Sequence, residues 1–179
     1  MRSESRHRWN PSLAGAAGGA GSTVQSDQMK VIIVGCGRVG ARLARQLDAE
    51  GHTVAVVDQQ VAAFDRLGRE FRGNMIVGNC IDEAVLRRAG VEDADCFVSV
   101  TSGDNRNLMA AQIAQRIFKV KRVITRLYDP IRESVYREMG LETFCPTTLG
   151  ADLIREYFLD GINHGRDASG VDGAAVRTS

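Results

Sequence analysis

Gly35-Cys36-Gly37-Arg38-Val39-Gly40 follows an apolar run, Met29 to Val34, and precedes a helix-like segment that ends near Gly51. In a strand–turn–helix unit of this kind, the first glycine permits the tight turn and the second lets the backbone approach a pyrophosphate. The third lets helix and strand pack closely. Free N–H groups and the positive dipole end of the helix would then face the phosphates. The stretch predicts a nucleotide-phosphate loop; the alternative is a glycine turn without a ligand.

An acidic residue closes the next apolar run, Thr53 to Val57. Asp58 lies at the distance expected of the carboxylate that accepts hydrogen bonds from an adenosine ribose. Gln59 and Gln60 follow it, and no arginine does. Because a 2′-phosphate would meet this carboxylate with no neutralising charge, the pattern favours NAD over NADP.

The charge balance of the 179-residue chain is close to neutral, with 23 Lys and Arg against 22 Asp and Glu. Nucleic-acid and membrane-surface binding depend mainly on clustered basic residues, so neither partner is expected and lipid contact should be indirect. No stretch approaches the roughly 20 apolar residues that a membrane helix requires. Composition predicts a flexible extension over residues 1–28, one domain over 29–161 and a disordered tail over 162–179.

Four widely spaced cysteines contain no C-x-x-C pair: Cys36, Cys80, Cys96 and Cys145. Neither a zinc site nor a redox dithiol is indicated, so we expect no metal and reduced thiols. Cys36 lies inside the glycine loop, where a helix N-terminus would lower the pKa of its thiol and make it redox-sensitive. The alternative, favoured by base rates, is a small residue that fits there.

Apolar strand-like runs alternate with helical segments through the core. The expected strands span residues 30–34, 53–57, 74–77, 96–100, 122–127 and 142–145. Gly51, Gly90 and Gly140 lie where a left-handed residue would end a helix, and Asp129-Pro130 is typical of a helix start. The alternation predicts a Rossmann-like, doubly wound parallel α/β sheet in the order 3-2-1-4-5-6, with its ligand crevice at the carboxyl ends of strands 1 and 4.

Catalytic machinery is not evident in the chain. The alternation occupies the whole core, which leaves no separate substrate domain, and we find no catalytic acid, base or nucleophile motif near the predicted crevice. This favours a nucleotide sensor over an enzyme. Two alternatives stay open: an NAD-dependent oxidoreductase domain that borrows catalytic groups from a partner, and a degenerate scaffold that has lost its ligand.

The segment from Val31 to Ala44 resembles the start of the nucleotide-binding domain of TrkA-type potassium-uptake regulators, also called RCK or KTN domains. Further matches follow in register through Asp58, Gly78-Asn79, Asp129-Pro130 and Pro146. The resemblance covers about residues 29–159. It implies a cytosolic regulatory subunit of a Trk/Ktr-type potassium uptake system, peripheral to the inner face of the plasma membrane. Such a subunit binds NAD(H) or ADP/ATP, gates a membrane potassium transporter and catalyses nothing.

The resemblance also assigns site residues. The glycine loop with Arg38 would surround the phosphates, Asp58 would hold the ribose, and Asn79 and Cys80 would lie beside adenine. The far side of the crevice would be lined by Thr101, Asp104, Asn107 and Arg126. The full predicted set is Gly35, Cys36, Gly37, Arg38, Val39, Gly40, Asp58, Asn79, Cys80, Thr101, Asp104, Asn107 and Arg126. For Arg38 the alternative is a surface arginine, and for Asp104 and Asn107 it is helix capping.

Two departures from the family pattern bear on function. Asn79 replaces the usual acid after strand 3, so nucleotide preference is open, and only a short polar tail follows Gly161 where many members continue into a smaller domain. A second effector site is therefore expected on a partner. An apolar stripe in residues 151–159 packs either on its own sheet or, as in the family, across to a neighbouring subunit in a homo- or hetero-oligomer.

Overall fold

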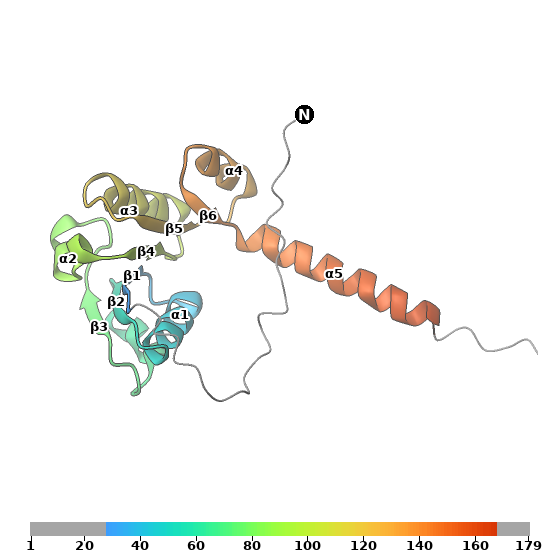
Figure 1. Cartoon of the computed structure of the whole chain (residues 1–179), viewed down its shortest axis with the longest axis horizontal. Helices are drawn as coiled ribbons and strands as arrows, with labels where there is room; N and C mark the ends of the chain where they lie inside the picture. The colour runs from blue at the N-terminus through green and yellow to red at the C-terminus, as the bar shows by residue number, and fades with distance from the viewer. Residues whose placement is uncertain (1–27, 168–179) are drawn as a thin grey trace, which may run out of the picture.

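Six parallel strands form one sheet in the order β3-β2-β1-β4-β5-β6. The structure is a computed structural model that describes residues 28–167 (Figure 1). The predicted strand order is confirmed, and strand bounds differ from the predicted ones by at most one residue, at the carboxyl ends. The strands are β1 Lys30–Val34, β2 Thr53–Asp58, β3 Asn74–Val77, β4 Cys96–Ser99, β5 Arg122–Arg126 and β6 Glu142–Phe144.

Strand β1 lies at the centre and is buried on both faces. Its Val31 is in register with Val54 of β2 on one side and Cys96 of β4 on the other. Successive side chains of a strand point to opposite faces, so Ile32 contributes to one apolar cluster and Ile33 to the other. This two-sided burial explains why the central strands are nearly continuous apolar runs.

Helices cover both faces of the sheet. Apolar residues of α1 (Arg38–Ala49) and the short η2 helix (Val61–Leu67) pack in the cluster on one face. Those of α2 (Glu83–Arg88) and α3 (Asp104–Arg116) pack in the cluster on the other. The remaining helices are η3 Val91–Asp93, α4 Pro130–Glu138 and α5 Pro146–Asp167. The helices on the two faces leave a cavity at the carboxyl ends of β1, β2 and β4.

The predicted helix ends are also confirmed. Gly51, Gly90 and Gly140 have φ values of 91°, 82° and 87°, in the left-handed region that glycine adopts without strain. The Asp129 carboxylate accepts hydrogen bonds from the N–H groups of Ile131 and Arg132, as expected of a residue that caps a helix.

Helix α5 projects away from the sheet (Figure 1). Its apolar stripe is exposed: Ile154, Tyr157 and Phe158 are 70%, 69% and 65% accessible, so the alternative that the stripe packs on its own sheet is wrong. The helix continues to Asp167, past the expected domain boundary at residue 161. The predicted segments 1–28 and 162–179 otherwise lie outside the described residues.

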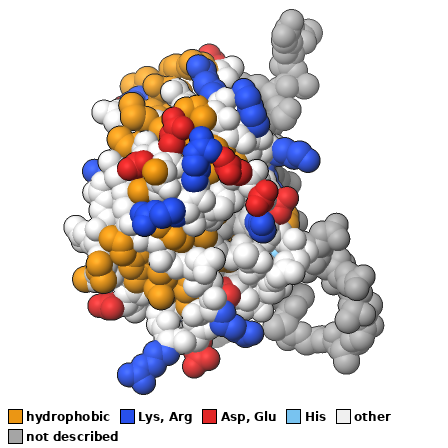
Figure 2. All heavy atoms as spheres, turned by 90° about the vertical axis from the view of Figure 1, so that its left-hand side faces the viewer, with side chains coloured by type: hydrophobic (Ala, Val, Ile, Leu, Met, Phe, Trp, Pro, Cys, Tyr) orange, Lys and Arg blue, Asp and Glu red, His pale blue; other side chains and the backbone are white. Residues whose placement is uncertain are grey.

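The sheet edge at β3 exposes a further group of apolar side chains. Met75 and Val77 of β3 and Val61 of η2 line a shallow hollow on this edge. Figure 2 shows hydrophobic side chains gathered in separate areas, with arginine, lysine and acidic side chains between them. Over residues 28–167, no helix combines the length and the apolar character needed to cross a bilayer.

Candidate nucleotide-binding site

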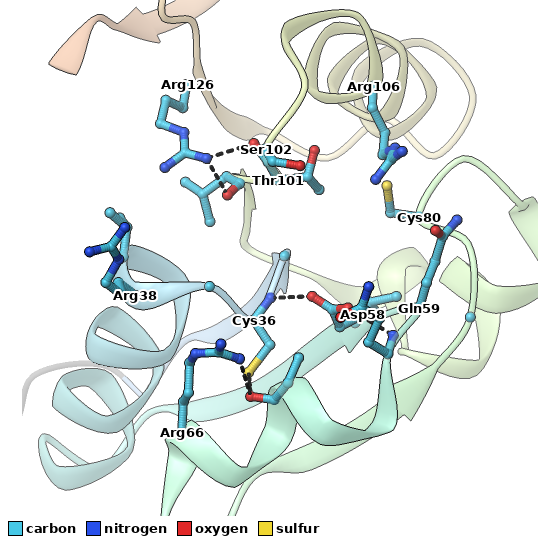
Figure 3. A pocket seen from close by; sticks show the side chains of 18 of the residues that line it. Cys36, Arg38, Asp58, Gln59, Arg66, Cys80, Thr101, Ser102, Arg106 and Arg126 are labelled. Carbon is cyan, nitrogen blue, oxygen red and sulfur yellow. Dashed lines mark hydrogen bonds between the residues drawn. The ribbon is translucent and has the colours of Figure 1, made fainter. Parts of the chain in front are cut away.

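A cavity of about 550 Å³ opens at the carboxyl ends of β1, β2 and β4 (Figure 3). The segments that follow β3 and β5 complete its walls. Predicted residues that line it are Gly35, Cys36, Gly37, Arg38, Val39, Asp58, Cys80, Thr101 and Arg126. Residues from distant parts of the sequence therefore meet at the crevice that the strand order predicts.

The three glycines of the loop occupy different surroundings. Gly35 has a φ of 102°, and a Cβ there would lie 2.8 Å from the backbone nitrogen of Thr101. A Cβ on Gly40 would lie 1.9 Å from the carbonyl oxygen of Gly35. A Cβ on Gly37 would meet nothing within 4 Å. The first and third glycines thus serve the turn and the close packing, while the second leaves open space beside the cavity.

Asp58 connects the end of β2 to the glycine loop. Its Oδ2 accepts a hydrogen bond from the backbone N–H of Cys36 at 2.7 Å, and its Oδ1 accepts one from Gln60 at 2.9 Å. A carboxylate has about four acceptor sites, so capacity remains for ribose hydroxyl groups. Asp58 therefore positions the loop and still faces the cavity.

Cys36 is a packed residue of the loop. Its side chain is fully buried, and its thiol donates to the carbonyl of Ala63 at 3.3 Å. Burial, with a further contribution from the negative charge of Asp58, raises the pKa of this thiol from 9.0 to about 11, against an opposing effect of Arg66. The prediction of a lowered pKa at the helix N-terminus is wrong, because the loss of hydration on burial favours the neutral thiol. The structure supports the small buried residue.

Arg126 brings a buried cation to the cavity. It is 6% exposed, and its Nη2 donates to the carbonyls of Val100 at 2.8 Å and Thr101 at 2.6 Å. Its guanidinium carbon lies 4.6 Å from the centroid of the Tyr128 ring. Within residues 28–167, the buried Nε has no hydrogen-bond partner and the side chain forms no ion pair. Such a group can pair with an anion that enters the cavity.

Asn107 is predicted to line the crevice but lies behind its wall. It is fully buried, and its Oδ1 accepts from the backbone N–H and the hydroxyl of Thr101 at 2.8 and 2.7 Å. Its Nδ2 donates to the carbonyls of Thr101 and Arg126, both at 3.0 Å. With every donor and acceptor engaged, the amide holds two cavity residues in place.

Three other predicted residues are also not among the lining residues. Gly40 lies in the first turn of α1. Asn79 accepts a hydrogen bond from the N–H of Ile81 at 3.3 Å. The Asp104 carboxylate accepts from the N–H groups of Tyr128 and Asp129, at 3.0 to 3.3 Å. The capping alternative for Asp104 is wrong, because Gly103 occupies the N-cap and Asp104 fastens α3 to the segment after β5 instead.

The cavity lining carries four arginines and a single carboxylate, that of Asp58. Arg66 and Arg106 were not predicted, nor were Gln59, Ser102 and Tyr128. Their local sequences read as ordinary solvated helix and loop residues, so only the tertiary fold reveals them. Among the described residues, no group of three His, Cys, Asp or Glu side chains is arranged to hold a metal.

The parallel sheet, the glycine loop and the cavity at its switch point define a Rossmann-like α/β domain, a class whose ligands bind at this place. Residues 31–145 match the model of the TrkA-N domain. The chain therefore belongs to the TrkA-N domain family, as the resemblance predicts.

Two curated relatives extend beyond the part that matches this chain. It is 43% identical over 154 residues to the Trk system potassium uptake protein TrkA of Streptomyces coelicolor, covering 84% of this chain and 69% of that protein. It is 32% identical over 111 residues to a TrkA homologue of Pyrococcus abyssi, covering 62% of this chain and 49% of that protein. The chain thus spans only part of either relative.

Solved structures share the fold. The Kef CTD of Shewanella denitrificans in its AMP-bound form has a TM-score of 0.65 at 21% identity, over 74% of this chain and 81% of that one. GsuK bound to ADP has a TM-score of 0.60 at 19% identity, over 70% and 32%. The GsuK channel bound to NAD has a TM-score of 0.55 at 18% identity, over 68% and 22%. At these identities the likeness concerns the fold.

Proposed function

We propose that this chain is a nucleotide-binding regulatory subunit of a Trk/Ktr-type potassium uptake system. It binds NAD(H) or ADP/ATP in the cavity, gates a membrane potassium transporter and catalyses no reaction. Family membership supports the proposal, as does the occurrence of AMP, ADP and NAD in structures that share the fold. Nucleotide binding would act by shifting the population of two arrangements of the assembled domains.

The observation that carries the proposal is one cavity that joins an open phosphate loop, a ribose-side carboxylate and an unpaired buried cation. The space beside Gly37 would admit phosphates, with Arg38 as their counter-charge. Asp58 would accept the ribose hydroxyls, and Cys80 would lie beside the base. Thr101 and Arg126 would close the far side.

The four predicted residues outside the lining would contribute indirectly. Gly40 permits the close approach of α1 to the loop, and Asn107 fixes the positions of Thr101 and Arg126. Asp104 holds α3 against the segment after β5, and Asn79 shapes the turn after β3. Each would affect nucleotide affinity through the geometry of residues that touch the ligand.

The exposed stripe of α5 supports the proposed assembly. Ile154, Tyr157 and Phe158 contact no other part of residues 28–159 closely enough to be buried, although large apolar side chains gain free energy from burial. In the proposed assembly, this stripe contacts a second RCK-type chain. The complex would lie at the inner face of the plasma membrane through its transporter, without direct lipid or nucleic-acid contact.

Thermal unfolding with and without nucleotide tests the proposal. A ligand that binds only the native state stabilises it by RT ln(1 + [L]/Kd), so NAD, NADH, ADP or ATP should raise the unfolding temperature. Arg38→Ala and Asp58→Ala should abolish the shift, and Arg45→Ala on the exposed side of α1 should preserve it. No shift with any of these nucleotides would contradict the proposal and favour a scaffold. A positive result leads to potassium-uptake assays in cells that lack the gene.

A further inference from the structure

The four arginines of the cavity lining differ in how they are held. Arg126 is fixed by the carbonyls of Val100 and Thr101, and Arg66 donates to Ala63 at 3.4 Å. Within the described part of the chain, Arg38 and Arg106 form neither a hydrogen bond nor an ion pair. Arg38 belongs to the phosphate loop. Arg106 lies elsewhere, so its presence in the lining calls for a different explanation.

Arg106 lies at the end of the cavity away from Arg38. Figure 3 shows its side chain extending from α3 toward Cys80, with Gln59 nearby, while Arg38 and Arg126 lie at the opposite end. An electrostatic effect agrees with this proximity: burial raises the pKa of the Cys80 thiol, and the positive charge of Arg106 is the main opposing influence. Figure 3 shows Asp58, the proposed ribose ligand, nearer to this end than Arg38 is. This end would therefore hold the nucleoside, and we call it the nucleoside end of the cavity.

The nucleoside end offers few other groups to a base. Tyr128 is the single aromatic residue in the cavity lining, and its ring is stacked on Arg126. Gly78 has no side chain, and a Cβ there would lie 2.6 Å from Val85. Asn79, expected beside adenine, does not line the cavity, and its Oδ1 accepts a hydrogen bond from the N–H of Ile81. A base at this end would have no aromatic ring to stack against.

Arg106 can supply that missing surface. A guanidinium is planar and stacks on aromatic faces, including those of nucleic-acid bases. The first turn of α3 is held in place on both sides of Arg106, because Asp104 is bonded to Tyr128 and Asn107 is bonded to Thr101. The side chain therefore extends over the cavity from a fixed support, which lowers the ordering cost of a contact.

We infer that Arg106 is a base-binding residue, whose guanidinium plane stacks on the base of the nucleotide in the proposed site. The inference rests on the proposed nucleotide binding and adds the residue that contacts the base. In this site the two arginines have different roles: Arg38 neutralises the phosphates, and Arg106 stacks on the base.

Calorimetric titration of the whole chain with AMP, ADP and inorganic pyrophosphate tests this division. Arg106→Ala should weaken AMP and ADP binding by the same factor, about two- to fivefold, since an exposed cation–π contact has that magnitude. Pyrophosphate binding should not change, because it has no base. Arg106→Lys keeps the charge but lacks the plane, so it should weaken both nucleotides to a similar extent. Arg116→Ala, an exposed arginine outside the cavity on the same helix, should bind as wild type does.

The outcomes separate the inference from the proposed function. Unchanged AMP and ADP binding in Arg106→Ala, or full recovery in Arg106→Lys, would overturn base stacking while the proposed site stands. A loss of pyrophosphate affinity in Arg106→Ala would also overturn it, because the contact would then be to phosphate. If the wild-type chain binds neither AMP nor ADP, the Arg106 inference falls. The proposed function falls with it only when NAD, NADH and ATP also fail to raise the unfolding temperature. Unfolding temperatures without ligand should match among the variants, because Arg106 is exposed and forms no hydrogen bond or ion pair within residues 28–167.

Discussion

The Asp58 carboxylate is hydrogen-bonded to the backbone N–H of Cys36, with Oδ2 and the nitrogen 2.7 Å apart. This contact joins the end of β2 to the glycine loop that follows β1. The residue predicted to hold a ribose therefore also supports the backbone of the loop. In the proposed site, loop geometry and nucleotide affinity would be coupled through this side chain.

Replacing Asp58 should consequently destabilise the protein even without nucleotide. In Asp58→Ala, the N–H groups of Cys36 and Gln60 lose their acceptor, which should lower the free energy of unfolding by about 1–3 kcal/mol. Urea unfolding without ligand measures this. Asp65→Ala is the control, because Asp65 is exposed and its side chain forms no hydrogen bond within residues 28–167. Equal stability of the two variants would show that the loop does not depend on Asp58.

Alanine at the third glycine of the loop should lower stability, whereas alanine at the second should lower nucleotide affinity. Gly40→Ala places a Cβ 1.9 Å from the Gly35 carbonyl oxygen, so it should cost more than about 3 kcal/mol of stability or prevent folding. Gly37→Ala meets no neighbouring atom within 4 Å, so stability should change by less than about 1 kcal/mol. Its methyl group would occupy the space proposed for phosphate, and ADP affinity should fall at least about tenfold. Unfolding curves and ADP titrations measure the pair; wild-type ADP affinity in Gly37→Ala would contradict the phosphate role.

The raised pKa of Cys36 predicts a loss of stability at alkaline pH. The thiol has a pKa of about 11 in the folded protein, against an ordinary value of 9.0. Between these values the unfolded chain releases its proton and the folded chain retains it, so stability falls as pH rises from about 9 to 11. Urea unfolding at pH 8 and pH 10 should show a smaller decrease for Cys36→Ala than for wild type. Identical decreases would mean that this thiol does not carry the effect.

Much of the fold follows from local sequence. The glycine loop, Asp129-Pro130 and the glycine helix ends each specify a backbone conformation that few other residues favour, and the structure has all of them. The apolar runs specify burial on both faces of a parallel sheet. The contact made by the apolar stripe of α5 could not be predicted from the sequence. Helical periodicity shows that one face is apolar, but it does not show which chain covers that face.

The site was less predictable than the fold. The glycine loop and Asp58 lie in adjacent segments with fixed spacing, so sequence indicates both. Arg66 and Arg106 enter the cavity through the crossovers that bring η2 and α3 to the same edge of the sheet. In the sequence they are indistinguishable from surface arginines. Asn79 shows the converse: its position in the chain indicates a contact, but it does not line the cavity, and its Oδ1 accepts a hydrogen bond from Ile81 within the turn.

The exposed stripe of α5 predicts self-association. Replacing Ile154 and Phe158 together by Glu should shift the chain from dimer to monomer, because a charge in an apolar interface loses its hydration. The unfolding temperature of the monomer should not fall below that of an equally dilute wild-type sample, since both side chains are exposed in the chain itself. Sedimentation velocity measures the change, with Arg155→Ser on the same helix as the control. A wild-type chain that is monomeric at all concentrations would contradict self-association through this stripe.

Arg126 gives the sharpest separation between stability and binding. Arg126→Met removes two hydrogen bonds from a charged donor, each worth about 1.5–3 kcal/mol. Burying a cation without a counter-charge costs the folded wild-type protein several kcal/mol, and the substitution removes that cost. The two effects oppose each other, so stability without ligand should change by less than about 2 kcal/mol.

Ligand-dependent stabilisation should nevertheless collapse in Arg126→Met, because the anion loses its buried partner. We expect ADP affinity to fall at least about tenfold, as measured by titration, and inorganic phosphate to stabilise the wild-type chain more than the variant. Arg132→Met serves as the control, since Arg132 lies outside the cavity lining and donates to Asn105 on the surface. If Arg126→Met bound ADP as wild type does, the cation would be a structural clamp on the carbonyls of Val100 and Thr101 and no part of the nucleotide site.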